Sequence, residues 1–150
     1  MAYDPHRGVV YVATGSPKPN FIGVRHRGDN LYSNCAIAVN ATTGEKLWHF
    51  QEIPHDICDL DIPSPPILVN INLNEKSYDA VAFLTKIGNT VLLDRLTGKP
   101  IFPMRYRRAP TSLLPGEQTA PYQPDSFFPQ PFARQKFSRD DVTDISEEAR

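Results

Sequence analysis

From residue 3 to residue 104, short apolar runs alternate with turn residues, and this pattern predicts an all-β fold. The runs are rich in β-branched, aliphatic and aromatic residues and are bounded by Gly, Pro, Asn or Asp, as strands commonly are. No stretch keeps the 3.6-residue period of an amphipathic helix, so no long helix is expected here. We see no opening strand before Gly8. The expected strands cover residues 8–14, 35–40, 45–51, 66–71, 79–85, 89–94 and 100–106.

Two predicted hairpins repeat at an offset of 54 residues, the separation of Trp48 and Phe102. Residues 36–48 and 90–102 each contain a strand, an Asn or Asp, turn residues, Thr-Gly and then an aromatic residue. A strand-rich period near 50 residues is typical of β-propeller blades. We therefore expect two blades in residues 1–104, with Trp48 or Phe102 filling the space between neighbours. A chance likeness of two hairpins is the alternative.

Two blades are too few to close a propeller, because closed rings use typically 4–8 blades. Each four-stranded blade buries its faces only against other blades. The pattern therefore indicates a segment of a longer protein, and the remaining blades of that protein would be its first partners.

Residues 105–150 and the prolines just before them form a different kind of segment. Eight of the 15 prolines lie between Pro100 and Pro131, interleaved with phenylalanines at positions 127, 128, 132 and 137. This stretch is too apolar for a solvated linker and too rich in proline for regular strands. We expect an extended segment held on a protein surface by its aromatic side chains. Residues 138–141 and 146–148 carry helix-start signals, so the start of a helix, truncated at the second signal, is expected here.

Charge and composition exclude some classes of function. Sixteen basic and seventeen acidic residues give a net charge of −1, so the basic excess typical of nucleic-acid-binding proteins is missing. No apolar run approaches the 18 residues of a transmembrane helix, and no signal-peptide pattern opens the chain. Cys35 and Cys58 have no metal-binding spacing and leave their pairing open.

The densest polar cluster runs from His55 to Asp61 and contains three carboxylates between two prolines. Such a run cannot be a buried strand, so we place it on a loop between blades, where functional residues concentrate. One carboxylate could act as a general base or a metal ligand. The alternative is that the acids accept hydrogen bonds from loop amides.

Other candidates are weaker. Lys86 follows an apolar strand and could hold an anion or a carbonyl in a central channel, or could be a solvated strand end. The long excursion over residues 15–34 contains Arg25 and Arg27, which could bind carboxylates or could lie on an exposed loop. The arginines at 105, 107 and 108 are interpreted as solvated surface, opposite acidic residues at 140, 141, 144, 147 and 148.

The motifs, taken in order, resemble one known family. The chain is similar to the quinoprotein dehydrogenases that use pyrroloquinoline quinone (PQQ), in particular to their membrane-bound glucose dehydrogenase branch. The likeness covers nearly the whole chain and depends on order and spacing rather than on any single piece. The matching pieces are residues 3–5, 9–11, 14–15, 28–34, 41–48, 51, 54–63, 85–89 and 93–101.

This resemblance implies an eight-bladed propeller of four-stranded antiparallel blades, with PQQ and Ca²⁺ in a central channel. It implies oxidation of a small-molecule alcohol or sugar hydroxyl in the periplasm, with electrons passed to ubiquinone or another acceptor. An N-terminal region outside this chain could anchor the protein to the inner membrane. The family's catalytic aspartate, in the pattern His-Asp-x-Trp-Asp, corresponds to Asp59, which would also contact the cofactor and the metal. Its cofactor-contacting lysine corresponds to Lys86.

The chain departs from the family pattern at two positions of the site. A metal-ligating Asn commonly follows Thr-Gly in the family, whereas this chain has Ser16. Serine is a poor calcium ligand, so Asn20 becomes the candidate in its place. Cys58 stands where the family has a tryptophan before the catalytic aspartate. Two hypotheses remain: a segment of a PQQ-dependent dehydrogenase, and a non-catalytic propeller of the same repeat type that acts as a binding scaffold.

Overall fold

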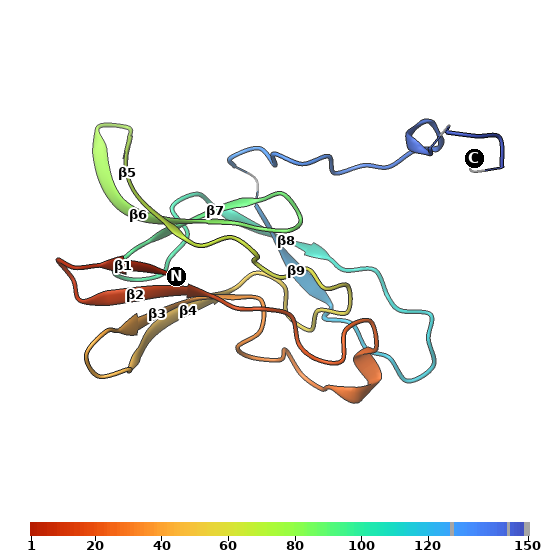
Figure 1. Cartoon of the computed structure of the whole chain (residues 1–150), viewed down its shortest axis with the longest axis horizontal. Helices are drawn as coiled ribbons and strands as arrows, with labels where there is room; N and C mark the ends of the chain where they lie inside the picture. Colours follow the sequence, from red (N-terminus) through yellow and green to blue (C-terminus); the bar gives the residue numbers. More distant parts are fainter. Residues whose placement is uncertain (127, 144, 149–150) are drawn as a thin grey trace.

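A computed structural model describes residues 1–126, 128–143 and 145–148 of the chain. Within these ranges the protein is all-β, as expected, and its strands form three antiparallel sheets (Figure 1). The first sheet has the order β1 (Ala2–Asp4), β2 (Val9–Ala13), β3 (Cys35–Asn40) and β4 (Lys46–Gln51). The second contains β5 (Ile67–Leu73), β6 (Lys76–Leu84) and β7 (Thr90–Asp94), and the third pairs β8 (Met104–Arg108) with β9 (Tyr122–Ser126).

The helical elements of the described residues are two 3₁₀ turns, η1 (Gly23–Arg25) and η2 (Arg139–Asp141). Among the described residues, no helix is long and apolar enough to span a membrane. The helix-start signal at Ser138 is used by η2, where Ser138 and Asp141 form a capping box. The expected beginning of a helix is thus a single turn.

Two expectations about strands were wrong. The chain does have an opening strand before Gly8, because β1 pairs with β2 through Tyr3 opposite Val10. Three residues are too few to show an alternating pattern. The proline-rich region also contains regular pairing, with Tyr106 of β8 opposite Pro124 of β9. Both strands of a two-stranded sheet are edges, where a residue without an N–H is tolerated.

The aromatic residues of this region pack less than expected. Phe128 contacts the ring of Phe102, with 4.8 Å between centroids, but Phe132 and Phe137 are exposed. Phe127 and Asp144 lie outside the described residues. The segment is instead held by its backbone, since Phe132 N–H donates to the Gly88 carbonyl.

The 54-residue repeat corresponds to two turns with the same hydrogen bonds. In the first turn, the Asn40 side chain accepts from the N–H groups of Thr42 and Thr43. In the second, the Asp94 side chain accepts from Leu96 and Thr97 N–H. Gly44 and Gly98 then donate to the carbonyls of Asn40 and Asp94, both at 2.9 Å. The sequence likeness therefore reflects one shared conformation.

Trp48 fills the space between the first and second sheets, as the repeat predicted for Trp48 or Phe102. Its ring lies against Gly98, and its indole N–H donates to the Arg95 carbonyl at 3.0 Å. Tyr11 lies beside it, with ring centroids 5.8 Å apart, and its hydroxyl donates to the same carbonyl. The core thus runs across both sheets, from Val9, Tyr11, Ala36, Ala38 and Trp48 to Ile62, Val81, Phe83, Val91 and Leu93.

We expect Gly98→Ala to lower the free energy of unfolding by about 3 kcal/mol. Gly98 has φ +69°, where a Cβ costs energy, and that Cβ would lie 2.5 Å from Cδ2 of Trp48. Gly44→Ala is the matched control, because Gly44 has φ +74° in the equivalent turn with open space around it. It should cost about 1 kcal/mol, from the backbone alone. Urea denaturation measures both values, and equal losses would contradict the contact with Trp48.

Candidate active site

Asp59 and Lys86 lie in direct contact. Lys86 is two residues beyond the end of β6, and its Nζ is 3.1 Å from Asp59 Oδ2 and 2.6 Å from the Asp59 carbonyl oxygen. The same ammonium forms an ion pair with Asp61. Hydrogen bonds and charge from Asp61 and Asp59 raise the pKa of Lys86. The structure therefore places one cation against two carboxylates of the His55–Asp61 cluster.

The loop that presents Asp59 is shaped by Asp56. Its carboxylate accepts from the N–H groups of Cys58 at 2.8 Å and Leu60 at 2.7 Å. It also accepts from Ser16 Oγ at 2.6 Å and Asn34 Nδ2 at 2.9 Å. Burial opposes ionisation of this carboxyl, but the four hydrogen bonds outweigh burial, and the pKa of Asp56 is lowered. Asp56 is thus a structural acceptor, which is the alternative considered for these acids.

Asp59 itself is turned outward by its backbone. Its φ is 58°, in the left-handed region that Asp and Asn tolerate better than most residues. The side chain is 35% exposed, compared with 3% for the residue Asp56. Of these two carboxylates, the one available to a substrate or a cofactor is therefore that of Asp59.

Asn20 reaches the same carboxylate from the long excursion between β2 and β3. Its Nδ2 donates to Asp59 Oδ1 at 2.5 Å, while its Oδ1 is buried without a hydrogen-bond partner among the described residues. Ser16 does not point there, because its hydroxyl donates to Asp56. An orphaned amide oxygen beside a carboxylate is a donor set that suits a hard cation such as Ca²⁺.

These two residues supply only part of a metal site. The described part of the chain contains no group of three or more His, Cys, Asp or Glu side chains arranged to hold a metal ion. Calcium takes six to eight oxygen ligands. Any cation held by Asp59 and Asn20 therefore needs further ligands from elsewhere in a longer protein or from the cofactor.

The other predicted candidates make different contacts. His55 is 7% exposed, and its Nδ1 is 2.7 Å from the Gly28 carbonyl oxygen. It lines a cavity of about 520 Å³ together with Arg27, Gly116 and residues 118–121, and neither Asp59 nor Lys86 is among the lining residues. Arg25 is exposed at the end of η1. Cys35 and Cys58 are both free thiols, the first buried and the second exposed.

Sequence reasoning missed two buried polar residues behind the site, Glu52 and Asn89. Glu52 is 0% exposed, and Asn89 Nδ2 donates to its Oε1 at 3.2 Å. Alternation along β4 carries the signal, because Trp48, Phe50 and Glu52 fall on one face of a strand. Since Trp48 was expected to be buried, this alternation is the signal that could have placed Glu52 on the inner face.

Comparisons with known proteins identify relatives over most of the chain. Residues 1–150 match the family model described as "PQQ: Glucose/ethanol/alcohol dehydrogenase, beta-propeller domain". Quinoprotein glucose dehydrogenase A of Acinetobacter calcoaceticus is 40% identical over 121 residues, which are 79% of this chain and 15% of that protein. Quinoprotein glucose dehydrogenase of Escherichia coli K12 is 32% identical over 126 residues, 83% of this chain and 16% of that protein.

Solved structures show the same likeness. Quinohemoprotein alcohol dehydrogenase from Comamonas testosteroni superposes with a TM-score of 0.63 at 31% identity, covering 78% of this chain and 18% of that one. A europium-containing methanol dehydrogenase gives 0.61 at 27% identity, covering 69% and 19%. The chain thus spans less than a fifth of the length of each of these four relatives.

Proposed function

Because the chain belongs to the PQQ family of glucose, ethanol and alcohol dehydrogenase β-propellers, we propose that the protein containing it oxidises an alcohol or sugar hydroxyl with PQQ. The observation that carries the proposal is the contact between Asp59 and Lys86, a carboxylate and an ammonium in the two motif positions that the family resemblance assigns to the base and the cofactor contact. We also propose a periplasmic location and transfer of the electrons to ubiquinone or another acceptor, both of which follow from the family resemblance.

The two residues have complementary roles in this chemistry. When bound, PQQ supplies a quinone that takes two electrons from the substrate carbon. Asp59 accepts the substrate hydroxyl proton at Oδ2, which makes the carbinol carbon a better hydride donor. Lys86 supplies a positive charge that stabilises the negative charge developing on the quinone oxygens as the substrate is oxidised. Its ion pair with Asp61 holds the ammonium beside Asp59 throughout.

A cation would be held by oxygen atoms of Asp59 and Asn20. Its chemistry would be that of a Lewis acid, which favours negative charge on an oxygen bound to it. Relatives of this fold include a europium-containing methanol dehydrogenase, so a hard trivalent ion is a second option beside Ca²⁺. Both ions prefer oxygen ligands.

Reconstitution of the full-length protein tests the proposal. PQQ and CaCl₂ should produce a cofactor absorbance band and alcohol-dependent reduction of a dye. Lys86→Met should weaken PQQ binding by about 10-fold or more, because a charge-assisted hydrogen bond is removed. Lys99→Met, at an exposed turn position, is the matched control and should leave binding unchanged. No spectral change in the wild-type protein would instead support the binding scaffold, which Ser16 and Cys58 favour.

Asn20 and Ser16 are separated by a second pair of variants. Asn20→Ala should raise the calcium concentration needed for half-maximal activity by about tenfold, because an amide ligand is lost. Ser16→Ala should leave that concentration unchanged but lower the free energy of unfolding by about 1 kcal/mol, since Asp56 loses a donor. Calcium titration after chelation and urea denaturation measure the two effects. A larger calcium effect for Ser16→Ala would return the ligand role to that residue.

A further inference from the structure

Glu52 is a fully buried carboxyl group that the proposed chemistry does not use. It follows β4 directly and is 0% exposed, on the same face of the strand as Trp48. Acidic residues are almost never fully buried unless they are paired. No ion pair of Glu52 is found among the described residues, so its environment needs a specific explanation.

On one side, Glu52 contacts the turn that carries Lys86. Asn89 Nδ2 donates to Glu52 Oε1 at 3.2 Å, and Thr85 also makes a side-chain hydrogen bond to this carboxyl. Thr85 and Asn89 close the turn, since Thr85 N–H donates to the Asn89 carbonyl at 3.0 Å and Asn89 N–H to Thr85 Oγ1 at 3.2 Å. Lys86 is the residue that follows Thr85 in this turn.

On the other side, Glu52 is joined to the loop of Asp59 through Asn34. The N–H of Glu52 donates to the Asn34 carbonyl at 3.0 Å. The side chain of Asn34 donates to Asp56 Oδ2 at 2.9 Å and to the Leu60 carbonyl at 3.1 Å. Glu52 therefore stands between the two segments that bring Asp59 and Lys86 together.

The surroundings of Glu52 favour its uncharged form. Burial raises the pKa of Glu52 to about 7, and hydrogen bonds from Thr85 and Asn89 oppose this rise only in part. These two neighbours and Asn34 are neutral, so no cation among them offsets the cost of a buried charge. Oε2 has no hydrogen-bond partner among the described residues. An ionised carboxylate there would have to draw in a donor or water.

We propose that Glu52 is a positioning residue whose uncharged side chain holds the Thr85–Asn89 turn, and with it Lys86, in place against the Asp59 loop. Ionisation of Glu52 loosens this turn. The inference rests on the proposed function only where Lys86 is taken to contact PQQ, because the link from Glu52 to the turn is a property of this chain alone. The affinity of the site for PQQ therefore depends on pH through Glu52, a group that takes no part in the reaction.

The direction of the effect follows from linkage. The pKa of Glu52 in the folded protein, about 7, lies above the ordinary value of 4.5 for an exposed glutamate, so the folded state retains the proton between these values. The contribution to stability is complete below about pH 4.5 and is lost as the pH rises towards 7. PQQ affinity should fall as the pH rises through about 7, where Glu52 ionises in the folded protein.

Hydrogen exchange of the full-length protein without cofactor gives the first test. Gly88 N–H donates to the Thr85 carbonyl within the turn, and Gly98 N–H, the reference, donates to the Asp94 carbonyl in the turn after β7. Relative to Gly98, exchange at Gly88 and Asn89 should accelerate about tenfold between pH 6 and pH 8. Glu52→Gln should remove this acceleration. Equal pH trends at the two turns in the wild-type protein would overturn the inference, whether or not the protein binds PQQ.

Cofactor affinity gives the second test. The Kd for PQQ should rise about tenfold from pH 6 to pH 8 in the wild-type protein and less than twofold in Glu52→Gln, with the KM for the alcohol little changed in both. Glu45→Gln, at an exposed position of the hairpin joining β3 and β4, should behave as wild type. A wild-type profile in Glu52→Gln would overturn the positioning role. Absence of PQQ binding at every pH would count against the proposed function, while the exchange result still decides the role of Glu52.

Discussion

Replacement of Asp59 by asparagine is expected to lower kcat for alcohol oxidation by about 10³-fold in the reconstituted full-length protein. The variant removes the only acceptor that we assign to the substrate hydroxyl proton. Asparagine keeps the shape of the side chain and tolerates the φ of 58° at this position, so the loop should be retained. Steady-state dye reduction measures the loss, and PQQ absorbance checks that the cofactor is still bound.

Asp61→Asn is the matched control for this variant. Asp61 pairs with the same ammonium of Lys86, but Asn20 donates to Asp59 and not to Asp61. We expect its kcat to fall by less than tenfold, because a partner of the cation is weakened while the base remains. Comparable losses in the two variants would show that both carboxylates act only through Lys86, and full activity in Asp59→Asn would reject Asp59 as the base.

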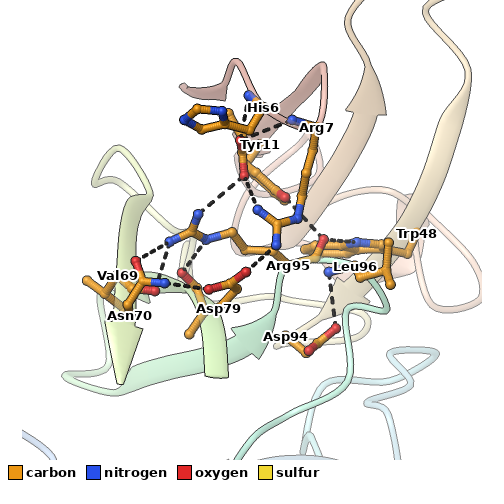
Figure 2. A network of polar contacts seen from close by, with 12 residues as sticks. His6, Arg7, Tyr11, Trp48, Val69, Asn70, Asp79, Asp94, Arg95 and Leu96 are labelled. Carbon is orange, nitrogen blue, oxygen red and sulfur yellow. Dashed lines mark hydrogen bonds and ion pairs between the residues drawn. The ribbon is translucent and has the colours of Figure 1, made fainter. Parts of the chain in front are cut away.

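The second large effect is on stability, at the junction of the first two sheets. Arg95 follows β7 and is 8% exposed. Its guanidinium donates to the carbonyls of Ala80 on β6 and Val69 on β5, both at 2.9 Å, and to the carboxylate of Asp4 on β1 at 3.2 Å (Figure 2). One side chain therefore connects two sheets through an ion pair and backbone hydrogen bonds.

Arg95→Met is expected to lower the free energy of unfolding by about 3–5 kcal/mol. The substitution leaves Asp4, which is 1% exposed, with Arg7 as its remaining cationic partner and removes the guanidinium hydrogen bonds to the Ala80 and Val69 carbonyls. Arg105→Met is the control, since the pair of Arg105 with Asp125 is exposed and should cost less than about 1 kcal/mol. Urea denaturation of both variants measures the difference. Equal losses would mean that burial adds nothing at Arg95.

Much of the fold could be predicted because its signals are local. The strand at residues 35–40 was placed at its observed bounds, since β-branched residues and a following Asn-x-x-Thr-Gly turn all lie within a few positions. The turn at Asn40 and its counterpart at Asp94 share their hydrogen bonds for the same reason. Strand β1 was missed because it is recognised by its pairing partner rather than by its own three residues.

The sequence predicted which residues belong to the candidate site but not how they are arranged in space. Motif positions gave Asp59 and Lys86 as candidates, and Asn20 was named in place of Ser16. Nothing along the chain separates Asp59 from Asp56 or Asp61 by chemistry. The separation comes from contacts. Asp56 accepts two hydrogen bonds from its own loop and two from the distant residues Ser16 and Asn34, while Asp59 keeps a partly exposed side chain. Glu52 was missed because its burial depends on Asn34 and Asn89, which come from two other segments.

The amino-acid sequence by itself determined the β-strands, the repeated turns and the family to which the chain belongs, because these depend on residues that are neighbours in the chain or stand in a fixed order. The tertiary structure alone decided which carboxylate accepts hydrogen bonds from loop amides, which two contact Lys86, and that a carboxyl is buried behind them. The physical reason is that the charge and hydrogen bonding of a side chain depend on burial and on partners brought from distant positions, and these exist only once the sheets are packed.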